Sequence, residues 1–248
     1  MPVYRDVGVV VRTHKLGESD RIVTIITQDS GKVRAVAKGV RKTGSRFGSR
    51  LEPMSHVQVQ LYRGRELDIV NQVELVEVAN NVRSSLECTT DGLAMCEIVE
   101  QLSHDRVPCK HLYRMLVGAL RQLDKQFSPL VLPALQLRLL EVEGVGPRVD
   151  SCVVCLGTTD LCAFDVAAGG VQCRDHKRGL SLSAEALDIM QAVLGGRVAE
   201  VLNRSGVSAS ATREVVEIAR ATTEHHLERR IRSTSLFEAP QEIGRAHV

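Results

Sequence analysis

The fold of this chain is decided by the stretch Arg21-Ile-Val-Thr-Ile-Ile-Thr-Gln-Asp-Ser-Gly-Lys-Val-Arg-Ala-Val-Ala37. Two runs rich in β-branched residues flank the turn residues Asp29-Ser-Gly31. Asp and Ser bond readily to the neighbouring backbone, and Gly accepts the left-handed conformation that tight turns need. The stretch therefore predicts a hairpin of two antiparallel strands, Arg21–Thr27 and Lys32–Ala37.

Three further segments on either side of this hairpin repeat the strand pattern. They are Val7–Arg12, Val57–Tyr62 and Leu67–Val78, and Arg63-Gly-Arg65 supplies the turn between the last two. A sheet of five short strands must close on itself to remove its unpaired edges, and a small Greek-key barrel of the OB type does so. We therefore expect residues 1–80 to form a five-stranded OB-fold barrel.

From Ser84 onward the apolar residues follow the period of helices. Helices are predicted around residues 93–102, 112–123, 130–142, 183–194 and 211–231. The third is apolar on nearly every face, which is typical of a helix at the centre of a domain. The predicted fold class is α+β: the barrel, an all-helical domain over residues 81–238 with a cysteine-bearing insert at 150–178, and a loose tail at 239–248.

Composition limits the function. The chain has 248 residues, a net charge of +2 and no run near the roughly 18 apolar residues of a membrane span. No apolar run follows the N-terminus, and an odd seven cysteines do not suggest a disulfide framework, so we expect a reducing, cytoplasmic location. Aromatic residues make up only 3% of the chain, so contacts with phosphates should dominate over base stacking.

Positive charge gathers between Asp29 and Glu52, where seven basic residues stand without an acid. Most of them lie on the segment 38–50, the basic loop, whose many Gly and Ser residues let the backbone approach a phosphate chain closely. The alternative is a solvated loop that only keeps the chain soluble. We predict that the barrel binds nucleic acid through this loop. Lys38, Arg41, Lys42 and Arg46 are expected to contact its phosphates, supported by Arg34 and Arg50.

Two further features of the basic loop bear on its role. Gly39 and Gly44 have the spacing of a nucleotide cradle, but Ser45-Arg46 follows in place of Lys-Ser and no helix period begins, so we discount this match. Phe47 and Tyr62 are the aromatic residues expected near the basic surface. Tyr62 could stack a base, although such a residue more often packs at a barrel rim.

The insert carries a metal-binding pattern. Cys152-Val-Val-Cys155 is a C-x2-C pair and Cys173-Arg-Asp-His176 is a C-x2-H pair. Each pair lets two ligands of one tight turn reach the same ion. The pattern predicts one structural zinc ion held by Cys152, Cys155, Cys173 and His176, with no open position for catalysis.

The other cysteines are not needed as metal ligands. Cys162 and Asp175 are weaker alternatives as zinc ligands, because neither has a partner at the required spacing. Cys88, Cys96 and Cys109 lie in helical segments and are expected to behave as small buried hydrophobes.

No catalytic set emerges from the polar residues. His225 and His226 are adjacent, so on a helix they point about 100° apart, and the His-Glu-x-x-His pattern is absent. Arg229, Arg230 and Arg232 suit the negative end of that helix's dipole. The sequence offers no Ser-His-Asp set, no Cys-His set and no cluster of carboxylates of the kind that binds catalytic Mg²⁺. We therefore expect a protein that is not an enzyme.

Several motifs, in order along the chain, resemble the bacterial recombination mediator family RecO. They are Val7–Thr13, Gly17–Val23, Gly31-Lys-Val33, Ala37–Lys42, Ser45-Arg-Phe-Gly48, Gly144, Pro147, the Cys152–Cys155 pair and Arg230-Ile-Arg-Ser233. The resemblance covers nearly the whole chain to about residue 238. Relatives that keep the metal pair often carry Cys in the fourth place, so His176 is a departure from the family pattern.

The resemblance implies an OB-fold followed by a helical domain with a zinc knuckle. It also implies binding to single- and double-stranded DNA and annealing of complementary strands. The implied partners are RecR, sometimes RecF, and the RecA that the family helps to load onto DNA coated by single-strand binding protein.

Two other functions fit the residues. The first is a zinc-stapled scaffold that recruits proteins, for which the basic loop is incidental; absence of salt-sensitive oligonucleotide binding would favour it. The second is an RNA-binding OB protein, which a comparison of RNA with DNA oligonucleotides separates, since the 2′-hydroxyl distinguishes the two locally.

Overall fold

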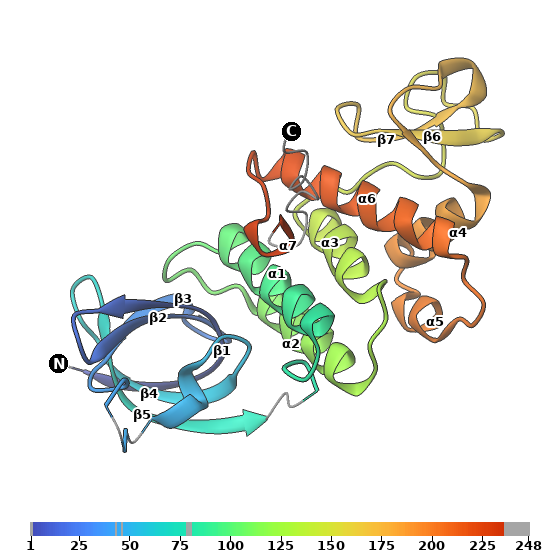
Figure 1. The fold of residues 1–248 in the computed structure, drawn as a ribbon. Helices are drawn as coiled ribbons and strands as arrows, with labels where there is room; N and C mark the ends of the chain where they lie inside the picture. Colours follow the sequence, from blue (N-terminus) through green and yellow to red (C-terminus); the bar gives the residue numbers. More distant parts are fainter. Residues whose placement is uncertain (1, 43, 46, 78–80, 236–248) are drawn as a thin grey trace, which may run out of the picture.

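The computed structural model describes residues 2–42, 44–45, 47–77 and 81–235 of the chain. A closed barrel lies at one end of the molecule, helices fill the middle, and a small ribbon lies at the other end (Figure 1). In the described part of the chain, no helix is both long and apolar enough to cross a membrane. The predicted tail at 239–248 lies outside the described residues.

The barrel has five strands in the order β1-β2-β3-β5-β4, as expected for the OB type. Their bounds are β1 Val3–Leu16, β2 Asp20–Thr27, β3 Gly31–Ala37, β4 His56–Tyr62 and β5 Asp68–Glu77. β1 is longer than predicted because it serves two neighbours: its first half pairs with β4 and its second half with β2. The two pairings overlap at Gly8 and Val9, within the strand Val7–Arg12 that the sequence predicts.

The turn between β2 and β3 requires its glycine. Gly31 has a φ of 72°, in the left-handed region. A Cβ atom at this position would lie 1.9 Å from the carbonyl oxygen of Val107, on the connection between α1 (Leu86–Leu102) and α2 (Lys110–Lys125). The hairpin turn therefore packs directly against the helical part of the chain.

The helical part comprises seven helices among the described residues. Besides α1 and α2 they are α3 Val131–Val142, α4 Ala184–Leu194, α5 Val198–Asn203, α6 Ala209–His226 and α7 Arg232–Ser235. The prediction that the last long helix continues to Ile231 is wrong. α6 ends at His226, Glu228 adopts a positive φ of 49°, and Ile231 is buried in the core that contains α1.

Helix α3 is central, as its sequence predicts, because its two faces serve two hydrophobic cores. Leu132, Leu135 and Leu139 pack into a core with α1, α2 and the barrel residues Val9 and Ile26. The opposite face packs into a second core with α4 and α6. The barrel and the first helices therefore share one core.

An arginine of the helical part also closes the barrel seam. β3 and β5 pair in parallel at only two positions, one of which is Asp68. The Asp68 carboxylate, fully buried, accepts hydrogen bonds from Tyr4 and from Arg106 at 2.8 Å. Burial opposes its ionisation, but these hydrogen bonds hold the pKa of Asp68 below its ordinary value. Arg106 thus locks the α1–α2 connection onto the barrel.

The ribbon is a three-stranded sheet in the order β7-β6-β8. Its strands are β6 Leu161–Asp165, β7 Gly170–Cys173 and β8 Leu180–Ser181, and a short 3-10 helix, η2 Arg174–His176, follows β7. Phe164 and Val171 are buried against the second helical core. The insert is therefore anchored to the helices that precede and follow it.

Candidate nucleic-acid interface and metal centre

The basic loop begins where β3 ends. Its predicted contact residues are exposed wherever they are described, and Arg34 is exposed on the neighbouring strand β3. Arg46 lies outside the described residues. The exposed set is Arg34, Lys38, Arg41, Lys42 and Arg50. Their contact with phosphates stays a prediction.

Two apolar side chains anchor the loop to the barrel. Phe47 and Leu51 are each 1% exposed and belong to the barrel core. Phe47 therefore lies beneath the basic loop, and its ring is not exposed for base stacking. β5 has two edges: one pairs with β4 along its length, and the other pairs with β3 at only two positions. The short helix η1, Gly48–Leu51, packs against β5. Phe47 and Arg50 line a pocket together with residues 71–75 of β5, so the loop lies beside the edge of β5 that β3 leaves unpaired.

The turn between β1 and β2 holds the other end of the loop. The Asp20 carboxylate accepts a 2.7 Å hydrogen bond from the Gly39 backbone N–H. The Ser19 carbonyl accepts the Arg41 N–H at 3.0 Å, and the Gly17 carbonyl accepts from the Arg41 guanidinium at 3.2 Å. The first residues of the loop are thus clamped to a neighbouring turn.

Sequence reasoning missed the role of Asp20, an acid within the basic surface. The Gly39 hydrogen bond, then that from Ser19, with smaller effects of Lys38 and Lys42, holds the pKa of Asp20 below its ordinary value. The hairpin register offered a signal: Arg21 lies opposite Ala37, so Asp20 must lie close to Lys38.

Two cations of the barrel are turned toward the helices. Lys32 Nζ donates to the Glu100 carbonyl at 3.2 Å and lies 3.3 Å from the Asp105 carboxylate. Arg12 pairs with the Glu100 carboxylate at 2.6 Å. One of the seven basic residues counted in the sequence therefore belongs to the contact between barrel and helices.

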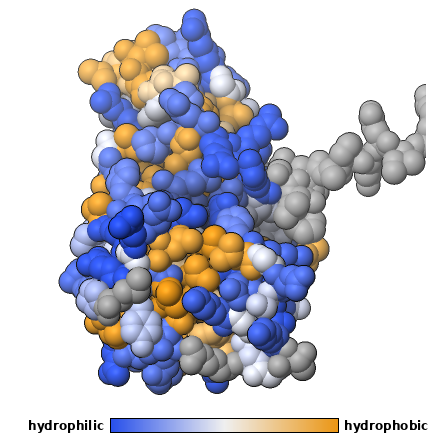
Figure 2. Space-filling view, turned by 90° about the vertical axis from the view of Figure 1, so that its left-hand side faces the viewer, coloured by the Kyte–Doolittle hydropathy of each residue, from blue (hydrophilic) through white to orange (hydrophobic). Residues whose placement is uncertain are grey.

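The free side of the barrel is mostly polar. Figure 2 views the barrel end and shows a largely hydrophilic surface, with one patch of apolar side chains near the middle of the view and another at its top. Tyr62 is half-buried at the end of β4, where it lies opposite Val3 and Ile69 on the neighbouring strands. This placement agrees with packing at the rim.

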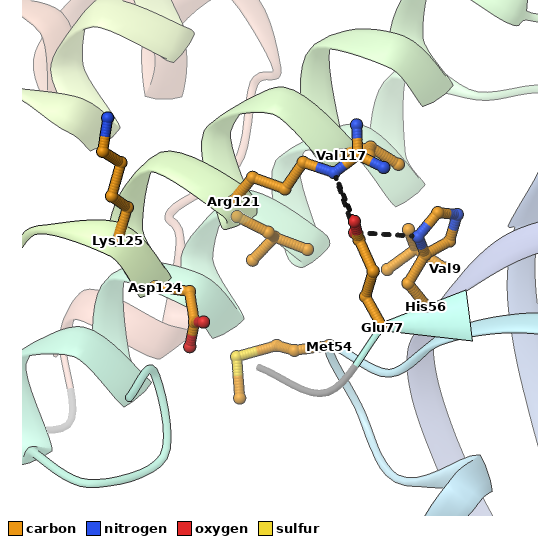
Figure 3. A pocket seen from close by; sticks show the side chains of 9 residues that line it. Val9, Met54, His56, Glu77, Val117, Arg121, Asp124 and Lys125 are labelled. Atoms are coloured by element: carbon orange, nitrogen blue, oxygen red, sulfur yellow. Dashed lines mark hydrogen bonds and ion pairs between the residues drawn. The ribbon is translucent and has the colours of Figure 1, made fainter. Parts of the chain in front are cut away.

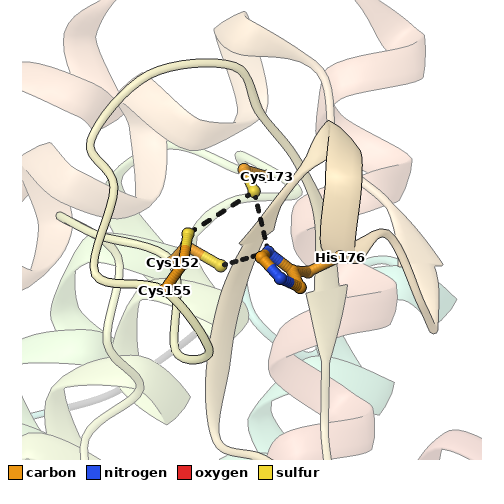
Figure 4. A group of neighbouring side chains, drawn as sticks. All are labelled: Cys152, Cys155, Cys173 and His176. Atoms are coloured by element: carbon orange, nitrogen blue, oxygen red, sulfur yellow. Dashed lines mark hydrogen bonds between the residues drawn. The ribbon is translucent and has the colours of Figure 1, made fainter.

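The predicted metal ligands Cys152, Cys155, Cys173 and His176 converge in the ribbon and form the metal-ligand cluster (Figure 4). Their ligand atoms all lie within 4.8 Å of one another. Cys173 Sγ is 3.2 Å from His176 Nδ1 and 3.8 Å from Cys155 Sγ. Cys152 Sγ is 3.9 Å from His176 Nδ1. Three thiols and an imidazole so arranged could hold one metal ion.

Local backbone structure prepares this cluster. The first cysteine pair sits on a tight turn, in which the Cys152 carbonyl accepts from the Leu156 N–H at 2.9 Å. Burial opposes ionisation of the Cys152 thiol, but backbone N–H groups, first that of Cys155 and then that of Cys173, lower its pKa to about 6. A thiolate is the form that binds a metal.

The remaining cysteines lie outside the cluster. Cys162 is half-buried on β6, and neither it nor Asp175 belongs to the group of converging ligands. Cys88, Cys96 and Cys109 are buried, as predicted. Burial raises the pKa of Cys96 to about 12, which keeps that thiol protonated and unreactive.

A pocket of about 280 Å³ lies where β4 and β5 meet α2 (Figure 3). Glu77 accepts hydrogen bonds from Arg121 at 2.7 Å and lies 3.3 Å from His56 Nδ1. His56 Nε2 lies 2.9 Å from the Tyr113 hydroxyl, and burial lowers the pKa of His56. These side chains bond to one another across the contact between the barrel and α2. We therefore interpret the pocket as part of the interface between barrel and helices.

Comparison with known proteins assigns both halves of the chain to one family. Residues 1–79 match the family model described as "Recombination protein O N terminal", and residues 83–235 match "Recombination protein O C terminal". The chain is similar to the "DNA repair protein RecO" of Frankia casuarinae, with 43% identity over 245 residues, 96% of this chain and 99% of that protein.

Proposed function

Because this chain belongs to the recombination protein O family of DNA-repair proteins, we propose that it binds single- and double-stranded DNA through the basic loop and anneals complementary strands. The observation that carries the proposal is the division of the loop into buried apolar anchors and exposed cations. Phe47 and Leu51 hold the loop on the barrel while Lys38, Arg41 and Lys42 stand in solvent.

Binding of this kind does not depend on base sequence. Each cation that neutralises a phosphate releases condensed counterions, which makes the affinity fall steeply with salt. The aromatic residue of the loop, Phe47, is buried, so the loop offers positive charge rather than a stacking platform. Arg34, on β3 beside the loop, and Arg50, at the end of the loop, would extend the contact.

Annealing would follow from the same surface without a bond-making step. A cationic surface that holds two strands lowers their mutual repulsion and raises their local concentration. We therefore propose a role that is not catalytic.

The family resemblance supports the partners proposed here. They are RecR, in some settings RecF, and the single-strand binding protein and RecA that meet on single-stranded DNA. The chain would help to load RecA onto DNA coated by single-strand binding protein, in the cytoplasm and close to the nucleoid.

We further propose that the metal-ligand cluster holds one structural zinc ion. A zinc–sulfur bond of about 2.3 Å places two thiolates of a tetrahedron about 3.8 Å apart. Cys155 Sγ and Cys173 Sγ lie 3.8 Å apart. With four protein ligands, zinc would cross-link the turn before β6 to the end of β7 and leave no position for a reacting water.

The salt dependence of DNA binding tests the proposed surface. Binding of a fluorescent mixed-sequence oligonucleotide would be followed by anisotropy for the wild type and for Lys38→Ala/Arg41→Ala/Lys42→Ala. Each lost phosphate contact lowers the slope of log K against log salt by about 0.7 to 0.9, so the triple variant should lose about 2 to 3.

A matched variant controls for net charge. Lys177→Ala/Arg178→Ala/Arg197→Ala removes three exposed cations from the ribbon and α4–α5 and should leave the slope unchanged. Equal slopes for both variants would remove the basic loop from the DNA site. Tighter binding to RNA than to DNA of the same sequence would favour the RNA-binding alternative, and no binding to either would favour the protein scaffold.

Annealing is measured separately, with complementary oligonucleotides coated by single-strand binding protein. The wild type should accelerate duplex formation, and the loop variant should lose this acceleration. Adding RecR should change the rate if the partnership holds.

A further inference from the structure

A groove of about 530 Å³ on the helical part, far from the basic loop in sequence, has no role in the proposed function. It lies between the first turns of α1, the segment before α3, α3 itself and α6. Large apolar side chains are exposed along it: Leu86 is 59%, Phe127 46% and Val216 37% exposed. Leu132 and Pro133 form the apolar floor.

A buried amide in this groove lacks a partner. Gln136 on α3 lines the groove and is only 2% exposed. Its Nε2 has no hydrogen-bond partner among the residues that the structure describes. Buried polar groups are almost always hydrogen-bonded, so an orphan donor inside a groove indicates that a ligand brings the acceptor.

The rim beside α1 is acidic and also lacks partners. Glu87 and Asp91 stand one helical turn apart, where like charges repel, and neither has an ion-pair partner in the described part of the chain. Burial, and then the Glu87 charge, raise the pKa of Asp91 to about 6. On the opposite rim Arg220 lies 3.8 Å from Glu224 on its own helix.

We propose that this groove binds a segment of a partner protein that carries a large apolar side chain next to a lysine or arginine. The apolar side chain would pack between Leu86, Phe127 and Leu132. The cation would pair with Asp91 and Glu87, and a backbone carbonyl of the segment would accept from Gln136 Nε2.

The charges of the groove select this occupant over others. The acidic rim repels nucleic-acid phosphates and acidic peptides, and the apolar floor offers nothing to a small ion. A peptide supplies the carbonyl, the apolar anchor and the cation together, as segments bound in grooves between helices commonly do. The volume is that of an ordinary ligand pocket.

Selection from displayed random linear peptides on the full chain provides the probe. The most enriched peptide would be synthesised with a fluorophore, and its Kd measured by anisotropy. We expect enriched sequences to pair Leu, Phe or Ile with Lys or Arg. Enrichment of acidic sequences, or of peptides whose binding does not depend on the groove, would overturn the proposal.

Three variants locate the probe. Glu87→Gln/Asp91→Asn removes the acidic rim, Val216→Trp fills the groove from its exposed edge, and each should weaken binding about tenfold or more. Glu141→Gln/Glu217→Gln removes two exposed acids on α3 and α6 and should not change it. Circular dichroism checks that each variant is folded, and the salt slope of DNA binding should stay that of the wild type.

Other occupants of the groove give distinct results. If residues 236–248 of the same chain fill it, Leu236→Ala/Phe237→Ala will strengthen probe binding. If a second copy fills it, sedimentation will show a dimer that Val216→Trp dissociates. Either result would overturn the assignment to a partner protein.

Discussion

The basic loop and the metal-ligand cluster lie on elements at opposite ends of the molecule (Figure 1), and they present their side chains in opposite ways. In the cluster, three thiols and an imidazole from two turns converge within 4.8 Å. In the basic loop, the described cations of one continuous segment are exposed to solvent, while the apolar side chains Phe47 and Leu51 turn inward.

The difference follows from what each region is suited to bind. A single ion needs ligands that meet at one point, so the cluster depends on the fixed geometry of the turns that carry its ligands. An extended polyanion needs charges spread along its length, so the loop depends on where its anchors place it. Substitutions should therefore act on stability in the ribbon and on affinity in the loop.

Loss of a cluster ligand should have the largest effect. Cys152→Ser is expected to abolish binding of about one zinc ion per chain and to lower the free energy of unfolding by on the order of 5 kcal/mol. Elemental analysis and denaturant unfolding measure both quantities. Cys162→Ser, in the same ribbon but outside the cluster, is the control and should keep the metal. A wild type that contains no metal and is no more stable than Cys152→Ser would contradict the prediction.

Removing the anchor of the loop should cost less but should affect both properties. Phe47→Ala deletes a ring that is 1% exposed and is expected to destabilise the barrel by about 3 kcal/mol. It should also weaken oligonucleotide binding, since the cations lose their attachment to the barrel. Urea unfolding and anisotropy test this, with Phe127→Ala, 46% exposed, as the control. Unchanged DNA affinity would show that the loop needs no anchor.

The groove extends the comparison to a carboxylate without a partner. The pKa of Asp91 in the folded chain is about 6, above its ordinary value of 3.8, so folding favours the protonated form. The stability that this provides is present at low pH and is lost as the pH rises through about 6. Asp91→Asn should therefore be more stable than the wild type near neutral pH. Because solvent partly screens the carboxylate, we expect the gain to be only about 1 kcal/mol.

Unfolding measured across the pH range checks the sign of this effect. The advantage of the Asn variant should shrink as the pH falls toward 4. Glu217→Gln, an exposed acid on α6, should show no such trend. A difference that grows with acidity would contradict the assignment.

The smallest effect is expected at Asp20, the acid within the basic surface. Asp20→Asn keeps an acceptor for the Gly39 N–H and removes one negative charge, so DNA should bind about twofold more tightly. Asp20→Ala removes the acceptor as well and should bind more weakly than the Asn variant. Anisotropy at fixed salt compares them, and equal affinities would show that the hydrogen bond does not position the loop.

Local patterns in the sequence determined much of this protein. Alternating apolar residues and the turn at Gly31 identified the β2–β3 hairpin, and the unbroken apolar faces of α3 identified a central helix. The spacing of Cys152, Cys155, Cys173 and His176 identified the cluster, since two ligands of one tight turn must point to the same place. These features depend on residues that are near neighbours along the chain.

Only the tertiary structure decided which of several side chains face the solvent and which are turned inward. Phe47 is buried because β3 leaves part of β5 uncovered, and Lys32 turns to Asp105 because the α1–α2 connection packs on the hairpin. Ile231 leaves α6 because the core around α1 accepts it. Each outcome depends on a surface built from distant parts of the chain, and the free energy of burying an apolar side chain there exceeds any local preference.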